Sequence, residues 1–376
     1  MAEILGLQTI MNSALPTGVD GTRLAKWALR SGMTYEEFAR RLATALTDLN
    51  QEMVNMWGDL MFLTEEPMFE YPDGGSVTPM PEITDTDIPD ARGATTIGHM
   101  IELRAYGDRV GGSKRWFRDA RQTQINAEVR RVVNSGKWRF EQTLLNRIFL
   151  PTEYQVGTSG YNVPFVHGTS GNVDFAPPAY GGEAFTTSHD HYVGVDSGSY
   201  GYDYTLNSLA EHLQEHGHEP PFIAYVSRAN VGSYSVLPSF VNPLGGTPIM
   251  IVESGGIASN INRYFSQDMR EFGRIGGFHS DYGYVELRAS NRIPSGYMSM
   301  HKSYGRLDQR NSIAVRVHPD VGFGFYIVPE TVVDNKYPLK SLQIEFEAGI
   351  GVGEDRTNGV AGYLVAGGTW ANPTIT

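Results

Sequence analysis

The sequence predicts a mixed α+β protein organised around one long helix. Between Lys114 and Leu150, apolar residues recur at steps of three and four, which is the period of a helix. Strand-like and helix-like segments alternate over residues 204–272, and short strand-like runs return over residues 313–365. The 376 residues are enough for two or three domains with cores of their own.

Composition excludes several classes of protein. The chain has no cysteine, which excludes disulfide frameworks, thiolate metal sites and thiol nucleophiles. No apolar run approaches the roughly 18 residues of a membrane span, and the first residues lack the basic start of a signal peptide. A net charge of −12 argues against nucleic-acid binding by the whole surface, but it leaves room for one basic face.

The long helical segment is strongly basic. A helix over residues 117–149 would be roughly 50 Å long. Residues 114–150 contain nine basic and three acidic side chains, a net +6 in an acidic chain. An isolated helix of this kind is more often a solvated face than a binding face, so both readings stay open. The candidate basic face comprises Arg118, Arg121, Arg130, Arg131, Lys137 and Arg139.

An acidic stretch precedes this helix. Residues 65–90 hold eight acidic side chains and five prolines, with no lysine or arginine, and the prolines exclude a helix. Residues 95–105 have strand character, which predicts a long two-stranded excursion, with disorder as the alternative. Its apolar residues need a surface to lie on. The candidate contact residues are Glu65, Glu66, Phe69, Glu70, Tyr71, Met80, Ile83 and Asp85.

The flanking segments complete the predicted order. Residues 1–33 form an arm, and a capping box at Thr34 and Glu37 opens a helix whose apolar stripe runs from Phe38 to Leu60. Residues 151–204, rich in glycine and tyrosine, predict a surface insertion with little core. The helices predicted beyond it cover 204–216, 227–237 and 257–272, and residues 274–303 predict a strand, a turn and a second strand. The other predicted strands cover 222–226, 248–252, 313–318, 323–328, 342–346 and 359–365, the last two joined by a glycine-rich hairpin.

No motif predicts a reaction. His212, His216 and His218, with His189 and His191 nearby, have partial metal-ligand spacing, but the HExxH pattern is absent and surface histidines are the favoured interpretation. The glycines of AGIGVGEDRTNGVAG lack the order of a phosphate-binding loop, and no GxSxG elbow is present. We therefore predict no catalytic residue, no cofactor and no metal.

The order of the segments resembles the Hong-Kong-97-type shell fold of tailed-bacteriophage major capsid proteins. Two stretches strengthen the match: GRIGGFHSDYGYVELRASNRIPSGYM is similar to the family's A-domain passage, and QIEFEAGIGVGEDRTNGVAGYLV to its closing P-domain strands. The resemblance implies an N-terminal arm and helix (1–62), an extended E-loop (63–110), the P-domain spine helix (111–150), a Gly/Tyr-rich insertion (151–203), an A-domain (204–329) and closing P-domain strands (330–376).

The resemblance also implies a function. A non-enzymatic capsid protein is expected, whose hexamers and pentamers enclose viral double-stranded DNA in the virion after assembly in the host cytoplasm. Expected partners are a separate scaffolding protein, a portal, any decoration protein and, without sequence specificity, the packaged DNA; no membrane is expected. No lysine lies between Lys26 and Lys114, which excludes a lysine cross-link from the predicted E-loop.

Three alternatives remain at this point. An encapsulin-like nanocompartment would share the fold and enclose a protein cargo. A metal-dependent hydrolase would use the His212 cluster, and a carbohydrate-binding β protein would use residues 151–204. Within the capsid reading, we expect each acidic excursion to lie across the basic helix of a neighbouring subunit.

Overall fold

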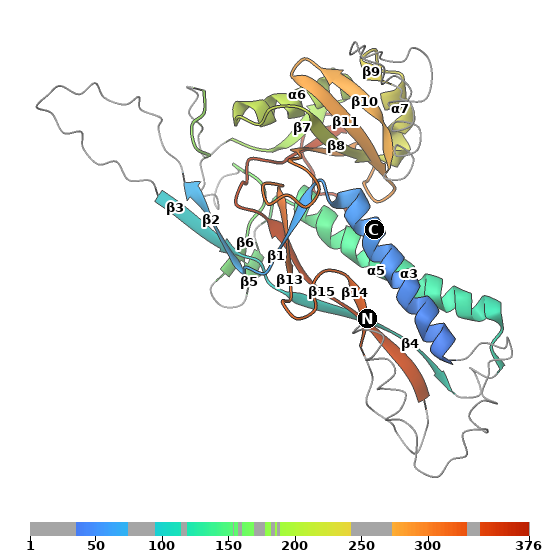
Figure 1. Cartoon of the computed structure of the whole chain (residues 1–376). Helices are drawn as coiled ribbons and strands as arrows, with labels where there is room; N and C mark the ends of the chain where they lie inside the picture. The colour runs from blue at the N-terminus through green and yellow to red at the C-terminus, as the bar shows by residue number, and fades with distance from the viewer. Residues whose placement is uncertain are drawn as a thin grey trace, which may run out of the picture. The chain divides into compact units, whose positions relative to one another are not determined.

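The computed structural model confirms the α+β class and divides the chain into two compact units (Figure 1). The first unit comprises Met1–Val54, Leu103–Phe140 and Val317–Ala348, and the second comprises Asn55–Glu102, Glu141–Arg316 and Gly349–Thr376. The structure describes residues 35–73, 95–113, 119–152, 154–156, 160–168, 177–181, 185, 189–241, 273–328 and 339–375. Three predicted elements lie outside the described residues: the arm with Thr34, the strand over 248–252 and the helix over 257–272. The division of the chain into the six segments that the resemblance implies stays a prediction.

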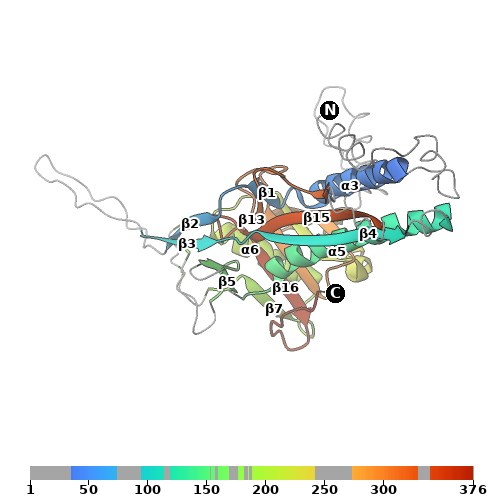
Figure 2. The same cartoon turned by 90° about the horizontal axis from the view of Figure 1, so that it is seen from below.

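Two helices and a sheet share the core of the first unit. Helix α3 (Tyr35–Trp57) buries the predicted stripe, and helix α5 (Gln122–Phe149) is the predicted long helix. Strand β15 (Leu339–Val352) pairs antiparallel with β4 (Arg104–Ser113) over ten residues and with β14 (Phe325–Val328) (Figure 2). One cluster of buried side chains joins these elements: Phe38, Ala39, Leu42, Leu46, Val110, Ala120, Ile125, Val132, Leu342 and Ile344.

Local chemistry sets the start and the packing of α5. The helix begins at Gln122, five residues later than the predicted Phe117, which lies outside the described residues. The side chain of Gln124 accepts a hydrogen bond from the backbone N–H of Arg121 at 2.8 Å and so caps the first turn. Gly136 interrupts the apolar pattern because the ring of Phe325 lies 2.8 Å from where its Cβ would be.

A seven-stranded mixed sheet forms the centre of the second unit. Its order is β7 (Tyr192–Asp196), β16 (Val360–Val365), β12 (Tyr297–Lys302), β8 (Phe222–Ser227), β11 (Gly283–Ser290), β10 (Arg274–Ser280) and β9 (Phe240–Val241). Helix α6 (Tyr202–Glu215) packs against it through Leu206, Leu209 and Leu213, which are completely buried. The structure confirms the predicted helix over 204–216, the strand over 222–226 and the strand pair after residue 274. After β8 come a 3-10 turn, η1 (Arg228–Asn230), and a short helix, α7 (Val231–Ser235), in place of one helix to residue 237.

One parallel pairing and two separate two-stranded sheets complete the fold. Strand β1 (Met61–Thr64) runs parallel to β13 (Ile313–Val317), and this pairing belongs to the five-stranded sheet of β1, β13, β15, β14 and β4. Strand β2 (Met68–Asp73) is antiparallel to β3 (Thr95–Met100), and β5 (Tyr154–Val156) is antiparallel to β6 (Gly160–Asn162). Among the described helices, none has the length and hydropathy to cross a membrane.

Two sequence-based expectations are wrong. Residues 151–203 are not a surface insertion with little core, because β7 is an edge strand of the seven-stranded sheet and Phe165 is completely buried. The glycines after residue 348 do not close a hairpin, because β15 and β16 belong to different sheets. Instead they allow close packing: a Cβ at Gly349 would clash with the carbonyl oxygen of Glu102, and a Cβ at Gly359 would clash with the ring of Phe165.

Candidate assembly surfaces and a histidine cluster

The β2–β3 pair is the predicted two-stranded excursion, and it forms a sheet of its own. Its register places Met68 opposite Met100. At its base, the backbone N–H of Ile101 donates to the carbonyl of Pro67 at 2.9 Å. Because side chains alternate along a strand, one side of the pair can be anchored while the other side is exposed.

The anchored side is part of the core of the second unit. Phe69 is 5% exposed and packs with Ile101, Ala314 and Phe62, whose ring meets it edge to face at 6.0 Å. The neighbouring ring of His99 stacks on Phe69 at 5.8 Å. The prediction took Phe69 as an apolar contact to a neighbouring subunit; its ring is instead covered by its own chain.

Tyr71 is held by a buried arginine. Its hydroxyl accepts a hydrogen bond from Nη1 of Arg356 at 2.9 Å, and the guanidinium lies 5.0 Å from the ring centroid. Arg356 also donates to the carbonyl oxygens of Pro164 and Phe165, so its charge is buried with several acceptors. Tyr71 is only 3% exposed, and it too was expected at an intersubunit contact.

His99 fastens β3 to the end of β15. Its Nε2–H donates to the carbonyl of Val352 at 2.8 Å. Burial lowers the pKa of His99 to about 4, so the ring is neutral at pH 7. The base of the excursion is therefore a packed core element, in which His99 is neutral and the charge of Arg356 is buried among acceptors, rather than a free adhesive surface.

The opposite side carries the predicted charge. Glu70 and Met68, which is 54% exposed, lie on this side, and Glu65 and Glu66, which precede β2, are exposed as well. Met80, Ile83 and Asp85 lie outside the described residues.

The basic helix divides into paired and exposed residues. Arg131 donates to Asp108 at 2.8 Å and to Glu128 at 3.0 Å, and hydrogen bonds to these carboxylates raise its pKa. Lys137 pairs with Glu52, and the guanidinium of Arg139 lies 5.2 Å from the ring centroid of Tyr106. Half of the predicted basic face is thus already engaged inside the first unit.

Two predicted basic residues remain available. Arg121 and Arg130 are exposed, and within the described part of the chain neither side chain has an ion pair. Arg118 lies outside the described residues. Among the described residues of the predicted face, Arg121 and Arg130 are therefore exposed and free of ion pairs.

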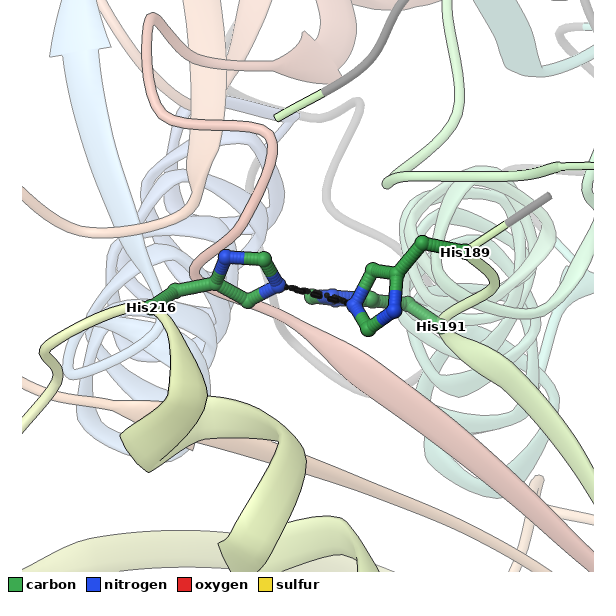
Figure 3. Close-up of side chains that lie close together, drawn as sticks. All are labelled: His189, His191 and His216. Carbon is green, nitrogen blue, oxygen red and sulfur yellow. Dashed lines mark hydrogen bonds between the residues drawn. The ribbon is translucent and has the colours of Figure 1, made fainter. Parts of the chain in front are cut away.

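Three histidines converge in the second unit (Figure 3). The Nε2 atoms of His189 and His191 are 3.2 Å apart, and each is 2.9 Å from Nε2 of His216. Burial lowers the pKa of His189 to about 4 and that of His216 to about 3, and it lowers the pKa of the completely buried His191 further below its usual value. The interpretation as surface histidines is wrong for His191.

The predicted grouping with His218 is also wrong. His218 lies apart from the three and contacts the hydroxyls of Thr357 and Tyr304. His212 is close, with its ring 5.8 Å from that of His189, but its Nδ1 faces the carbonyl of Ser208 at 2.8 Å. The i, i+4 spacing of His212 and His216 predicts a histidine cluster at the end of this helix. Only the fold adds His189 and His191, the two residues on either side of Asp190.

The comparisons with known proteins agree with the resemblance at the level of the fold. No protein-family model and no curated protein sequence matches this chain. The structure is similar to a chain of Mycobacterium phage Patience, with a TM-score of 0.60, 21% identity and 92% of both chains covered. Capsid structures of Cyanophage P-SCSP1u and of a native GTA particle align with TM-scores of 0.47 and 0.46, at 10% and 11% identity, over 83% of this chain and 88% and 91% of theirs.

The chain has the Hong-Kong-97-type capsid fold. The first of these similarities covers 92% of both chains. At this identity it establishes the architecture, and function has to be argued from the surfaces described above.

Proposed function

We propose that this protein is a major capsid protein, a non-enzymatic subunit that assembles into hexamers and pentamers and closes an icosahedral shell around viral double-stranded DNA. The observation that carries the proposal is the full-length similarity to a phage chain, with 92% of both chains covered. The anchored excursion and the long helix supply the structural parts that such a shell requires.

The excursion acts as the link between subunits. Its base is fixed by Phe69, Tyr71 and His99, so the exposed side can be presented in a defined direction. Burial of Met68 and of apolar residues beyond β2 provides affinity, because apolar area contributes about 25 cal/mol per Å². The exposed glutamates set encounter rate and register, since exposed ion pairs are worth only about 0–1 kcal/mol each.

Arg121 and Arg130 face a polyanion inside the shell. Contacts from exposed arginines to phosphates are independent of sequence and weaken with salt. Before packaging, an acidic scaffolding protein occupies the same surface; a portal completes the particle in the virion, and assembly takes place in the host cytoplasm.

Electron microscopy of the untagged protein, expressed alone and with a scaffolding protein, tests the assignment. We expect capsomers or closed particles. A monodisperse monomer at micromolar concentration under both conditions would contradict it.

Particles from the natural source should contain nuclease-protected DNA. A protein cargo in place of DNA would point to a nanocompartment. The hydrolase alternative is not proposed, because Asp190, the carboxylate between His189 and His191, is held by His167 and by the backbone N–H of Tyr192 and so is not placed to act as a general base.

A further inference from the structure

The three convergent histidines come from two separate parts of the second unit. His189 and His191 lie directly before β7, an edge strand that pairs with β16. His216 is the C-terminal cap residue of α6, which packs on the same sheet. Packed elements therefore fix both sides of the cluster, as a preorganised site requires.

The nitrogen positions match those of a metal site. A tetrahedral centre with metal–nitrogen bonds of 2.0–2.1 Å separates its ligand nitrogens by roughly 3.3 Å. The observed separations of 3.2, 2.9 and 2.9 Å are within a few tenths of an ångström of that value. Figure 3 shows these nitrogens facing one another across the cluster.

Hydrogen bonding alone leaves the cluster unsatisfied. Nδ1 of His191 lies 2.8 Å from the carbonyl of Gly359 and donates to it, so its Nε2 carries a lone pair directed at the other two rings. Each of the three Nε2 atoms bears either a proton or a lone pair. Because there are three atoms and two states, at least two are alike and repel each other at about hydrogen-bond distance. A single cation satisfies all three.

The surroundings indicate a structural ion. The carboxylate of Asp190 is turned to Nδ1 of His167, at 3.1 Å, and to the backbone N–H of Tyr192, at 2.8 Å. The ring of Phe185 covers the cluster, with its centroid 4.3 Å from that of His216. Three neutral imidazoles suit Zn²⁺, Co²⁺ or Ni²⁺ rather than Mg²⁺ or Ca²⁺, which prefer oxygen ligands.

We propose that His189, His191 and His216 bind one divalent transition-metal ion of the Zn²⁺ class, which clamps the segment before β7 to the end of α6. A water molecule or His212 completes the coordination. The site goes beyond the shell function and does not depend on it, since all three ligands belong to one chain.

Metal binding by chelator-stripped, untagged protein tests the site. One equivalent of CoCl₂ should produce the intense visible absorption of tetrahedral cobalt, and ZnCl₂ should displace it at one ion per chain. His216→Gln and His189→Gln should weaken binding by at least about 100-fold. His279→Gln, which changes an exposed histidine on β10, should bind as the wild type does.

Equal binding by all variants would mean an adventitious ion only and would overturn the proposal, as would failure of the wild type to bind at one equivalent. X-ray absorption on the zinc-loaded wild type does not depend on the folding of any variant. Three imidazole nitrogens at about 2.0 Å support the site, and an oxygen-only shell refutes it.

Discussion

The sequence predicts an acidic excursion and a basic helix, and the fold treats the described parts of the two, the β2–β3 pair and helix α5, differently. The excursion buries its apolar side in its own unit and leaves its glutamates exposed. Arg131 and Lys137 of helix α5 are paired with Asp108 and Glu52 of the first unit, whereas Arg130 and Arg121, the residue before the helix, are exposed. A charged segment of sequence therefore predicts that the segment lies at the surface. Which of its charged residues are available for binding depends on whether the fold places an oppositely charged residue of the same chain beside them.

The largest effect should come from breaking the anchored side of the excursion. Phe69→Ala removes a buried ring that contacts Phe62 and Ile101 and should lower the free energy of unfolding by about 3–5 kcal/mol. Met68→Ala, one residue away on the exposed side, should cost less than about 0.5 kcal/mol and impair particle formation instead. Urea unfolding of unassembled subunits measures the change in the free energy of unfolding for each of the two variants. Equal destabilisation would show that the two sides of β2 do not differ.

Low pH should destabilise the packed base of the β2–β3 excursion. The folded-state pKa of His99 is about 4, against 6.5 for an unperturbed histidine, so between these values the unfolded chain binds a proton that the folded chain does not. This contribution, about 3 kcal/mol, is fully present above pH 6.5 and is lost as the pH falls towards 4. His99→Gln should reduce the acid slope of stability in that window by the share of one proton, measured by urea unfolding from pH 7 to 4, while the other histidines with a lowered pKa, His189, His191 and His216 among them, keep the rest of the slope. His279→Gln is the control, and an unchanged acid slope in His99→Gln would contradict the assignment.

Substitutions on the basic helix should separate folding from binding. Arg131→Ala removes contacts to Asp108 and Glu128 and should cost about 1 kcal/mol of stability, while Arg130→Ala should cost almost none. Affinity for short double-stranded DNA should show the reverse order, and its dependence on salt should fall by about one counterion for Arg130→Ala alone. Equal losses of DNA affinity in Arg130→Ala and Arg131→Ala would mean that an ion pair within the subunit does not determine whether an arginine can bind DNA.

Charge reversal on the excursion should have the smallest effect on folding. Replacing Glu65, Glu66 and Glu70 with lysine should change subunit stability by less than about 0.5 kcal/mol, because all three are exposed. Assembly followed by light scattering should slow or misregister at low ionic strength and recover partly in salt. Unchanged kinetics at low ionic strength would remove the proposed docking of the excursion on a neighbouring basic helix.

The sequence by itself determined the elements that local periodicity encodes. These are the stripe of α3, the existence of α5, strand β8 and the β10–β11 pair, because apolar spacing along a chain reports directly which face of a helix or strand is buried. The absence of cysteine likewise excluded whole classes of site without any structure. The order of these elements was enough to imply the fold.

Only the tertiary structure decided which distant residues meet. It covers Tyr71 with Arg356, pairs Arg131 with Asp108, separates β15 from β16 and brings His216 to His189 and His191. These outcomes depend on long-range packing, in which glycines at close approaches and buried hydrogen-bond partners matter more than spacing along the chain. Periodicity carries no information about such contacts, and it is these contacts that determine both the available charge and the candidate metal site.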